Sequence, residues 1–294
     1  MTTTVATPVT APPKVSSARR RRVKGGRNYL GGLFGWVWLA IIIIPIYYVV
    51  VTSFKDQGAY FTQNPLALPN PPTLTAYQQV VEGGIIRYFF NSVIVTVGAV
   101  VPLVLFSFLA SYAIVRGDSR LLRFSRTMFL LGLAIPLQAT IIPLYLIITR
   151  IHMYDSLGAL ILPSIAFGIP LSVLILSNFI RDVPRELFES MRLDGCTDWQ
   201  MAWKLAFPLT RPAIVTVSIY NGLAVWNGFL FALILTQSPD KRVMPLALWA
   251  FQGEYTVNIP AVLAAVVLST LPILVLYIVG RRQMLRGLTA GFGK

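Results

Sequence analysis

The chain contains few of the residues from which an active site or a metal centre is usually built. Its 294 residues include one cysteine, Cys196, and one histidine, His152. No disulfide can therefore form within the chain, and no set of cysteines and histidines is available to hold zinc. The pattern G-x-x-x-x-G-K-[ST], whose backbone holds nucleotide phosphates in many ATPases, does not occur. We expect a chain that hydrolyses no ATP by itself.

Charged residues are also scarce, at 12%, whereas hydrophobic residues make up 55% and the mean hydropathy is +0.68. One soluble core could not bury so much apolar surface, so the composition indicates a membrane protein. A bilayer-spanning helix needs about 20 mostly apolar residues. Six segments without any Asp, Glu, Lys or Arg qualify: Leu30–Thr52, Tyr88–Val115, Thr127–Ile148, Ser156–Ile180, Ile214–Thr236 and Ile259–Gly280.

These segments must be helical, because lipid offers the backbone N–H and C=O groups no other partner. The predicted fold class is therefore an all-α membrane protein with about six transmembrane helices. Several prolines fall inside or near the segments, so we expect kinked or broken helices. They are Pro45, Pro102, Pro136, Pro143, Pro163, Pro170 and Pro272.

The distribution of the basic residues predicts the orientation. Most of the 25 Lys and Arg precede the first span, follow the last one, or lie in the second and fourth connections. Cytoplasmic loops carry this excess, so both termini and the loop after Ile180 are expected in the cytoplasm. Residues 1–29 are predicted to be a disordered, basic cytoplasmic tail. Topology and anionic lipid headgroups account for the net charge of +14 without a nucleic-acid partner.

The predicted spans contain no acidic residue of the kind that proton- or sodium-driven carriers use. Neutral polar side chains lie within or beside these spans instead. They could form hydrogen bonds between helices. They could also line a path for an uncharged polyol. This set of candidate translocation-path residues comprises Asn91, Gln138, Asn178, Asn221, Trp226 and Asn227.

The central loop, residues 183–208, has the pattern of a helix, a sharp turn and a second helix. Pro184 and Glu186 suit a helix N-terminus, and Gly195 suits a left-handed terminating residue. Thr197 and Gln200 have the spacing of a capping box, and Pro208 is expected to stop the second helix. That helix is unusually apolar, so it fits either a groove on a partner or the lipid headgroup layer.

The same loop resembles the EAA loop of ABC importer permeases, with Glu189, Gly195 and Pro208 at the motif's spacing. "VPRELFE", "LTRPAI", "TSFK", "FFNS", "WNGFLFALILT" and "RGLTAGFGK" resemble the carbohydrate branch, in particular the second permease subunit of maltose-type importers. The resemblance covers nearly all of residues 30–294, which would form one ABC importer transmembrane domain.

The resemblance implies a complex in a prokaryotic inner membrane. Its other members would be a second permease in a heterodimer, two ATP-binding subunits and an external solute-binding protein. The cargo would be a sugar or oligosaccharide. The chain would need no cofactor, since the partner subunits would bind ATP and Mg. The implied ATPase-coupling residues are Glu186, Glu189, Asp194, Gly195, Trp199, Trp203 and Pro208, and the implied ATPase-facing tail residues are Gly287, Gly291 and Gly293.

Two other interpretations remain open at this point. A stand-alone carrier or channel for a small polar solute could use the same spans, although such carriers usually show an intramembrane acid or an inverted repeat. A membrane-embedded enzyme would have to build its chemistry from Cys196 and His152.

Overall fold

The computed structural model describes residues 29–247 and 257–290. The predicted tail, apart from Tyr29, therefore lies outside the described residues, as do Gly291 and Gly293. By its internal contacts the chain divides into residues 1–45 and 46–294, and the boundary falls within the first helix. The candidate site is contained entirely in the second of these units.

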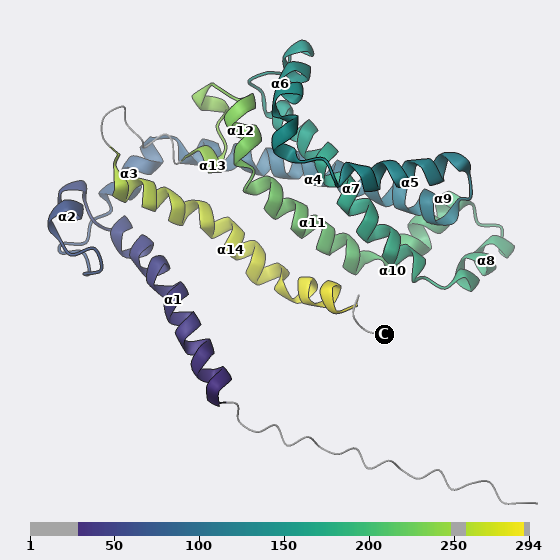
Figure 1. The fold of residues 1–294 in the computed structure, drawn as a ribbon, viewed down its shortest axis with the longest axis horizontal. Coiled ribbons are helices and arrows are strands. Elements are labelled where there is room, and N and C mark those ends of the chain that lie inside the picture. Colours follow the sequence, from purple (N-terminus) through teal and green to yellow (C-terminus); the bar gives the residue numbers. More distant parts are fainter. Residues whose placement is uncertain (1–28, 248–256, 291–294) are drawn as a thin grey trace, which may run out of the picture. The chain divides into compact units, whose positions relative to one another are not determined.

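The described residues form helices joined by loops (Figure 1). The α-helices are α1 (Tyr29–Ser53), α2 (Gln57–Thr62), α3 (Thr75–Glu82), α4 (Ile85–Arg116), α5 (Arg120–Gly132), α6 (Ile141–Arg150), α7 (Leu157–Arg181), α8 (Arg185–Leu193), α9 (Asp198–Met201), α10 (Phe207–Leu209), α11 (Arg211–Trp226), α12 (Phe229–Leu235), α13 (Met244–Ala247) and α14 (Ile259–Ala290). Short 3₁₀ segments are η1 (Leu137–Thr140) and η3 (Pro239–Lys241), and η2 (Ala202–Ala206) is a π-helix. The prediction of an all-α protein is confirmed.

Within the described residues, three helices are long and apolar enough to cross a membrane. They lie in α1, α4 and α7 and match the first, second and fourth predicted spans. The number rises to five if each of two bent helix pairs counts as one span. The predicted sixth span lies in α14, whose described apolar stretch is Ile259–Val275. The predicted number of six spans is thus not confirmed by length and composition.

The predicted third span, Thr127–Ile148, is not one straight helix. Instead, α5 and the segment 137–150 meet at an angle of 101°. Pro136 lies in the break with an extended backbone, φ −69° and ψ 127°. Its ring removes a backbone donor and disfavours helix in the preceding residue. The expectation of a broken helix at a proline is confirmed here, and the bent pair is either one broken span or a re-entrant loop.

The predicted fifth span also bends, by 47° between α11 and α12, but without a proline. The bend falls at Asn227 and Gly228. A Cβ on Gly228 would lie 2.9 Å from the Val225 carbonyl oxygen, so this turn needs glycine.

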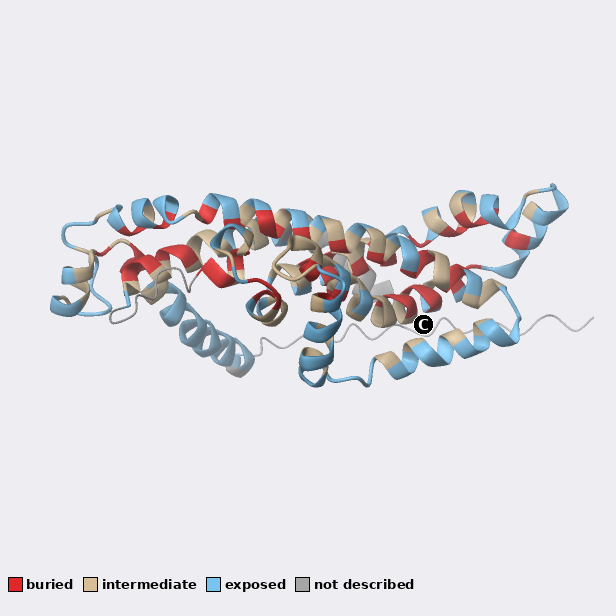
Figure 2. Cartoon of the chain, turned by 90° about the horizontal axis from the view of Figure 1, so that it is seen from above, coloured by how far each residue is buried: buried red, intermediate tan, exposed pale blue. Residues whose placement is uncertain are grey.

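The centre of the second unit is the close packing of α4 against α7. Gly168 allows this approach, because a Cβ there would lie only 2.1 Å from Leu103 Cδ1. Ser111 Oγ donates to the Val173 carbonyl oxygen at 3.1 Å, and Asn221 of α11 donates to Ser172 Oγ at 3.0 Å. Small residues with hydrogen bonds between helices are typical of membrane interfaces. Figure 2 marks the buried residues in red along several of the helices. Many large apolar residues are nevertheless exposed.

Candidate functional site

The central loop folds as a helix–turn–helix. Helix α8 begins directly after Pro184, carries Glu186 in its first turn, and ends before Gly195, whose φ is +79°. Thr197 Oγ1 accepts from the Gln200 N–H at 3.3 Å, and Gln200 Oε1 accepts from the Thr197 N–H at 2.9 Å. The left-handed glycine and the capping box predicted from the sequence are both confirmed.

Pro208 does not stop the second helix, so this prediction was wrong. Helix α9 continues through the π-helix η2 into α10, and the chain turns at Thr210 before α11 begins. The Phe207 N–H reaches the Ala202 carbonyl, five residues back. This wider turn shifts the hydrogen-bond pattern just before Pro208, so its ring and missing N–H are accommodated within the helical run.

One face of the loop is fixed to the end of α4 by aromatic contacts. Phe188 is only 2% exposed, and the Arg116 guanidinium carbon lies 4.0 Å from the centre of its ring. The rings of Trp203 and Phe207 lie 5.6 and 5.4 Å from that of Phe108. Both geometries are favourable for rings and for a cation over a ring. The loop therefore has a firm attachment to a central helix.

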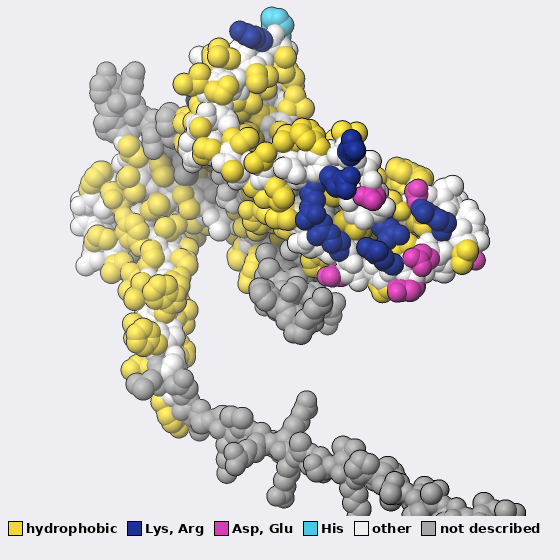
Figure 3. All heavy atoms as spheres, turned by 45° about the vertical axis from the view of Figure 1, so that its right-hand side comes forward, with side chains coloured by type: hydrophobic (Ala, Val, Ile, Leu, Met, Phe, Trp, Pro, Cys, Tyr) yellow, Lys and Arg dark blue, Asp and Glu magenta, His cyan; other side chains and the backbone are white. Residues whose placement is uncertain are grey.

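The opposite face is open. Glu186, Glu189 and Asp194 are exposed, and none of their carboxylates forms an ion pair or side-chain hydrogen bond within the described residues. Leu193 is 90% and Trp199 62% exposed, and Pro208 is exposed as well. Figure 3 shows acidic side chains at this end of the molecule beside a larger group of Lys and Arg. The loop thus presents acidic and apolar side chains together, on one attached scaffold.

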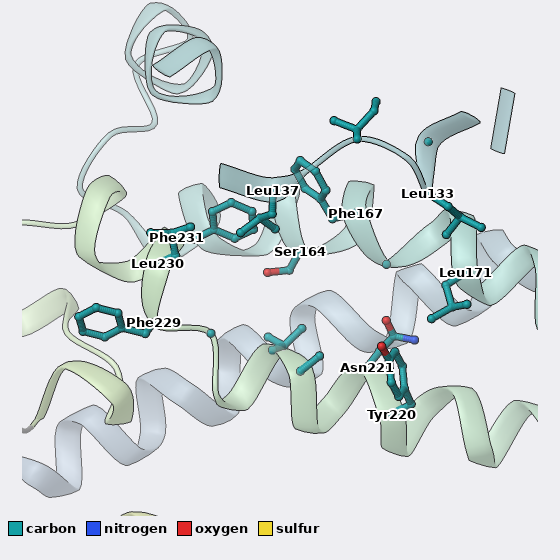
Figure 4. A pocket seen from close by; sticks show the side chains of 16 residues that line it. Leu133, Leu137, Ser164, Phe167, Leu171, Tyr220, Asn221, Phe229, Leu230 and Phe231 are labelled. Carbon is teal, nitrogen blue, oxygen red and sulfur yellow. The ribbon is translucent and has the colours of Figure 1, made fainter. Parts of the chain in front are cut away.

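Of the candidate path residues, Asn221 lines a large hollow, of about 450 Å³ (Figure 4). Its walls come from α7, α11, α12 and the break after α5. They are mostly apolar, with Ser164 and Tyr220 adding hydroxyl groups to the amide. Concave sites with a few polar groups on apolar walls are typical of small-molecule sites. Ser164, Phe167 and Tyr220 carried no signal in the sequence, because only the packing of distant helices brings them together.

The structure does not bring the other five candidates into this hollow. Asn91 donates to the Asp240 and Arg242 carbonyl oxygens, both at 2.8 Å, and so fastens a loop. Asn227 donates to the Leu223 carbonyl of its own helix. Gln138 is exposed, Asn178 lines a small hollow between α5 and α7, and Trp226 lines a separate hollow of about 200 Å³. The six residues therefore lie in different surroundings.

A further polar cluster, not predicted from the sequence, lies outside the spans. The Asp155 carboxylate accepts from the backbone N–H groups of Gln237 and Ser238 at 2.8 and 2.9 Å, and from the Ser238 hydroxyl. Asp155 itself has φ +59°, unusual for a residue with a side chain. Burial raises the pKa of this carboxyl, but the hydrogen bonds and the Lys241 charge outweigh it and lower the pKa overall. Asp155 thus joins the α6–α7 turn to the loop after α12.

The remaining candidates add no chemistry of their own. Gly287 lies in α14. Cys196 is a free, half-buried thiol in the turn after Gly195. In the ranges 29–247 and 257–290, no three His, Cys, Asp or Glu residues lie together in a way that could hold a metal ion.

The comparisons with known proteins agree with this architecture. Residues 103–284 match the family described as "Binding-protein-dependent transport system inner membrane component". A putative ABC transporter permease from Caldicellulosiruptor sp. is 39% identical, over 88% of this chain and 94% of its own length. The diacetylchitobiose uptake system permease NgcG of Streptomyces coelicolor is 30% identical, over 87% and 85%.

The fold is similar to that of a solved structure of a bacterial ABC transporter that imports alginate. The TM-score is 0.75 at 22% identity, and the match covers 87% of this chain and 98% of that one. The chain therefore belongs to the inner membrane components of binding-protein-dependent transport systems, the ABC importer permeases that the loop at residues 183–208 resembles.

Proposed function

We propose that this permease forms half of the translocation path of an ATP-driven sugar importer and that residues 183–208 couple it to separate ATP-binding subunits. The observation that carries the proposal is the two-sided character of the loop. Phe188 is buried against α4, while Glu186, Glu189 and Trp199 are exposed. A surface of this kind suits docking of an amphipathic helix in a partner's groove.

The same contacts offer a mechanical route from the loop to the path. A displacement of the loop acts on α4 through Phe188 and Trp203. Helix α4 is packed tightly on α7, and α7 is joined to α11 by the hydrogen bond between Ser172 and Asn221. Asn221 lines the large hollow. Closure of the ATP-binding subunits would thus move the walls of the hollow as a rigid body.

A carbohydrate is the cargo class that we propose. Relatives include permeases named for diacetylchitobiose, sulfoquinovosyl glycerol and arabinooligosaccharide transport. The large hollow offers a few hydrogen-bonding groups, Asn221, Ser164 and Tyr220, among apolar walls. Such a lining would bind a polyol weakly, which favours passage, because a transported solute must also leave its site.

The proposed complex contains a second permease, two ATP-binding subunits that hold ATP and Mg, and an external solute-binding protein. Both termini and Gly195 would face the cytoplasm, where these ATP-binding subunits reside. Reporter fusions after Lys294 and near Gln63 should therefore report opposite sides of the membrane. The same side for both would contradict the proposed topology.

Reconstitution tests which subunits hydrolyse ATP and whether sugar uptake depends on them. The purified chain alone should show no ATPase activity, and sugar uptake into vesicles should require the ATP-binding subunits. Glu189→Lys reverses an exposed charge without touching the buried Phe188, so it should reduce co-purification of the ATP-binding subunits at normal membrane levels. Uptake that proceeds without these subunits would instead indicate a stand-alone carrier or channel.

A further inference from the structure

A small hollow between α5 and α7 combines basic and hydroxyl groups with an apolar floor. Its volume is about 20 Å³. Arg126 contributes from α5, and Ser177, Asn178 and Arg181 contribute from α7. Apolar side chains complete the lining: Phe129, Leu130, Pro170, Val173 and Leu174. The hollow is separate from the proposed sugar path and from the coupling loop, and neither function uses these residues.

Ser177 is the unusual member of this group. It is only 5% exposed, and its hydroxyl has no hydrogen-bond partner within the described part of the chain. Several other serines in the helices donate their hydroxyls to the carbonyl four residues back, as Ser172 does to Gly168 and Ser218 to Ile214, although Ser107 is also without a partner in the described residues. For Ser177 that carbonyl belongs to Val173.

The Val173 carbonyl is already occupied, because it accepts from Ser111 of α4 at 3.1 Å. The Ser177 hydroxyl is thereby left without its usual acceptor. A buried hydroxyl without a hydrogen-bond partner destabilises the fold. A ligand atom that accepts a hydrogen bond from this hydroxyl would therefore be favoured.

The two arginines are also unpaired. Arg123, Arg192 and Lys241 have carboxylate partners, whereas Arg126 and Arg181 form no ion pair across residues 29–247 and 257–290. Asp182 follows Arg181 in sequence but makes no ion pair with it. Two free guanidinium groups at one hollow favour an anion, and the planar guanidinium matches phosphate particularly well. Figure 3 shows that Lys and Arg gather at this end of the molecule.

The depth of the hollow in the membrane indicates the source of the anion. Helices α5 and α7 run antiparallel here, since Gly132 lies beside Pro170 while Arg126 shares the hollow with Arg181. Ser177 is four residues from the end of α7 at Arg181, or about 6 Å along the axis. A headgroup layer is about 5–8 Å thick on each side of the hydrocarbon core. The polar end of the hollow thus lies at headgroup level, and the apolar floor continues toward the acyl chains.

We propose that this hollow binds the phosphate of an anionic phospholipid, with Arg126 and Arg181 on its charge and the Ser177 hydroxyl donating to one oxygen. The volume of about 20 Å³ admits a single oxygen atom or water rather than a sugar ring. Exposed Leu130 and half-buried Leu174 beside it would contact an acyl chain. Basic pockets between transmembrane helices at a cytoplasmic surface are suited to such headgroups.

Native mass spectrometry of the purified transporter complex tests the site. The complex is stripped of lipid in a neutral detergent and titrated with dioctanoyl phosphatidylglycerol or dioctanoyl phosphatidylcholine. Phosphatidylglycerol should bind in preference. Arg126→Gln and Arg181→Gln should each weaken its binding about tenfold, as expected for loss of a charged hydrogen bond, and Ser177→Ala about fivefold.

Matched variants separate the site from general charge and stability. Arg123→Gln removes the same charge from the same helix, but Arg123 is paired with Asp118 and does not line the hollow. Its effect on phosphatidylglycerol binding should therefore stay within about twofold, as for other exposed charges. Ser218→Ala removes a satisfied hydroxyl and should leave lipid binding unchanged. Ser177→Ala should not lower the thermal unfolding midpoint in detergent, because its hydroxyl has no partner to lose.

Three results would overturn the proposal. Equal binding of phosphatidylcholine would remove the anion selectivity. Binding of inorganic phosphate alone, with the same dependence on Arg126, Arg181 and Ser177, would indicate a site for soluble anions. Unchanged lipid binding together with reduced recovery of ATP-binding subunits in both arginine variants would assign the surface to a protein partner. Because no transport is measured, each result leaves the importer function to its own tests.

Discussion

At one end of the helix bundle, the loop at residues 183–208 rests on α4 through the rings of Phe188, Trp203 and Phe207. At the other end, the α6–α7 turn is joined to the loop after α12 by hydrogen bonds to the carboxylate of Asp155. The burial of apolar ring surface is largely non-directional, whereas hydrogen bonds lose strength steeply when the angle changes.

The difference suits two different tasks. An attachment through tilted and edge-to-face rings can change its angle and still transmit a displacement to α4. A turn held by three donors to one carboxylate keeps its shape until the carboxylate is lost. We therefore expect the first end to act as a lever and the second as a fixed connection.

Phe188→Ala should have the largest effect. The ring is 2% exposed and lies under the Arg116 guanidinium, so truncation should cost about 3–5 kcal/mol at the loop. The ring also packs near Tyr112 of α4, but α4 and α7 are held mainly by their packing on each other. Amide hydrogen exchange should therefore speed up in residues 185–210 and stay unchanged in α4 and α7.

Phe188→Leu is the control for this prediction. It keeps apolar volume at the site and loses the contact with the Arg116 charge, worth about 0.5–2 kcal/mol. Exchange should rise less than in Phe188→Ala. Equal behaviour of the two variants would mean that the guanidinium contact, not burial, attaches the loop.

Gly195→Val should have the next largest effect. The glycine has φ +79°, and nothing lies within 4 Å of a Cβ built there, so the penalty comes from the backbone alone. A β-branched residue in this conformation should cost about 1–2 kcal/mol. The turn should open, and co-purification of the ATP-binding subunits should fall several-fold at normal membrane levels.

Gly195→Asn provides the matched comparison, because asparagine tolerates a positive φ and is also larger than glycine. It should retain most of the bound ATP-binding subunits. Loss of the bound ATP-binding subunits in both variants would show that side-chain volume matters at this position. Normal sugar uptake in Gly195→Val would show that the loop does not couple the permease to these subunits.

The Asp155 connection should respond to pH, unlike the ring contacts. Its pKa is lowered in the folded chain, chiefly because the hydrogen bonds and Lys241 outweigh the effect of burial. A lowered pKa stabilises the fold above the ordinary value of 3.8, and this contribution is lost as the pH falls through the folded-state pKa. Asp155→Asn should therefore lower the unfolding midpoint at pH 7, and the difference from wild type should vanish in acid.

Asp194→Asn removes the same charge from an exposed carboxylate without partners and should leave the midpoint unchanged. A difference between wild type and Asp155→Asn that persists undiminished at low pH would contradict the charge-based account. It would indicate that the shape of the turn, with Asp155 at φ +59°, depends on the side chain's size instead.

Local sequence patterns predicted the helix–turn–helix conformation of the loop at residues 183–208 well. Gly195 and the pair Thr197 and Gln200 act over a few residues, so their spacing alone specifies the turn and the cap. Pro208 shows the limit of such local rules, because the π-helix η2 accommodates it within the helical run.

Contacts between distant segments could not be predicted in this way. Nothing in the sequence distinguished Phe188 from other apolar loop residues, because its contact with Arg116 arises only in the folded chain. Asp155 and Ser238 are 83 residues apart in sequence. Asn91, predicted as a path residue from its polarity, instead holds two carbonyl groups some 150 residues away.

The smallest effect is expected at the ion pair of Arg192 with Asp198, which crosses the turn at Gly195. Their side chains are 66% and 70% exposed, so the pair should contribute about 0.2–1 kcal/mol and weaken with salt. A double-mutant cycle of Arg192→Ala and Asp198→Ala, read out by hydrogen exchange of the loop, measures this coupling directly. Each residue also lies at the helix end that favours its charge, so the single variants should cost slightly more than the coupling itself. A coupling above about 2 kcal/mol would mean that this charge pair holds the turn. The loop would then be fixed by directional contacts like the Asp155 connection, and it would be less suited to act as a lever.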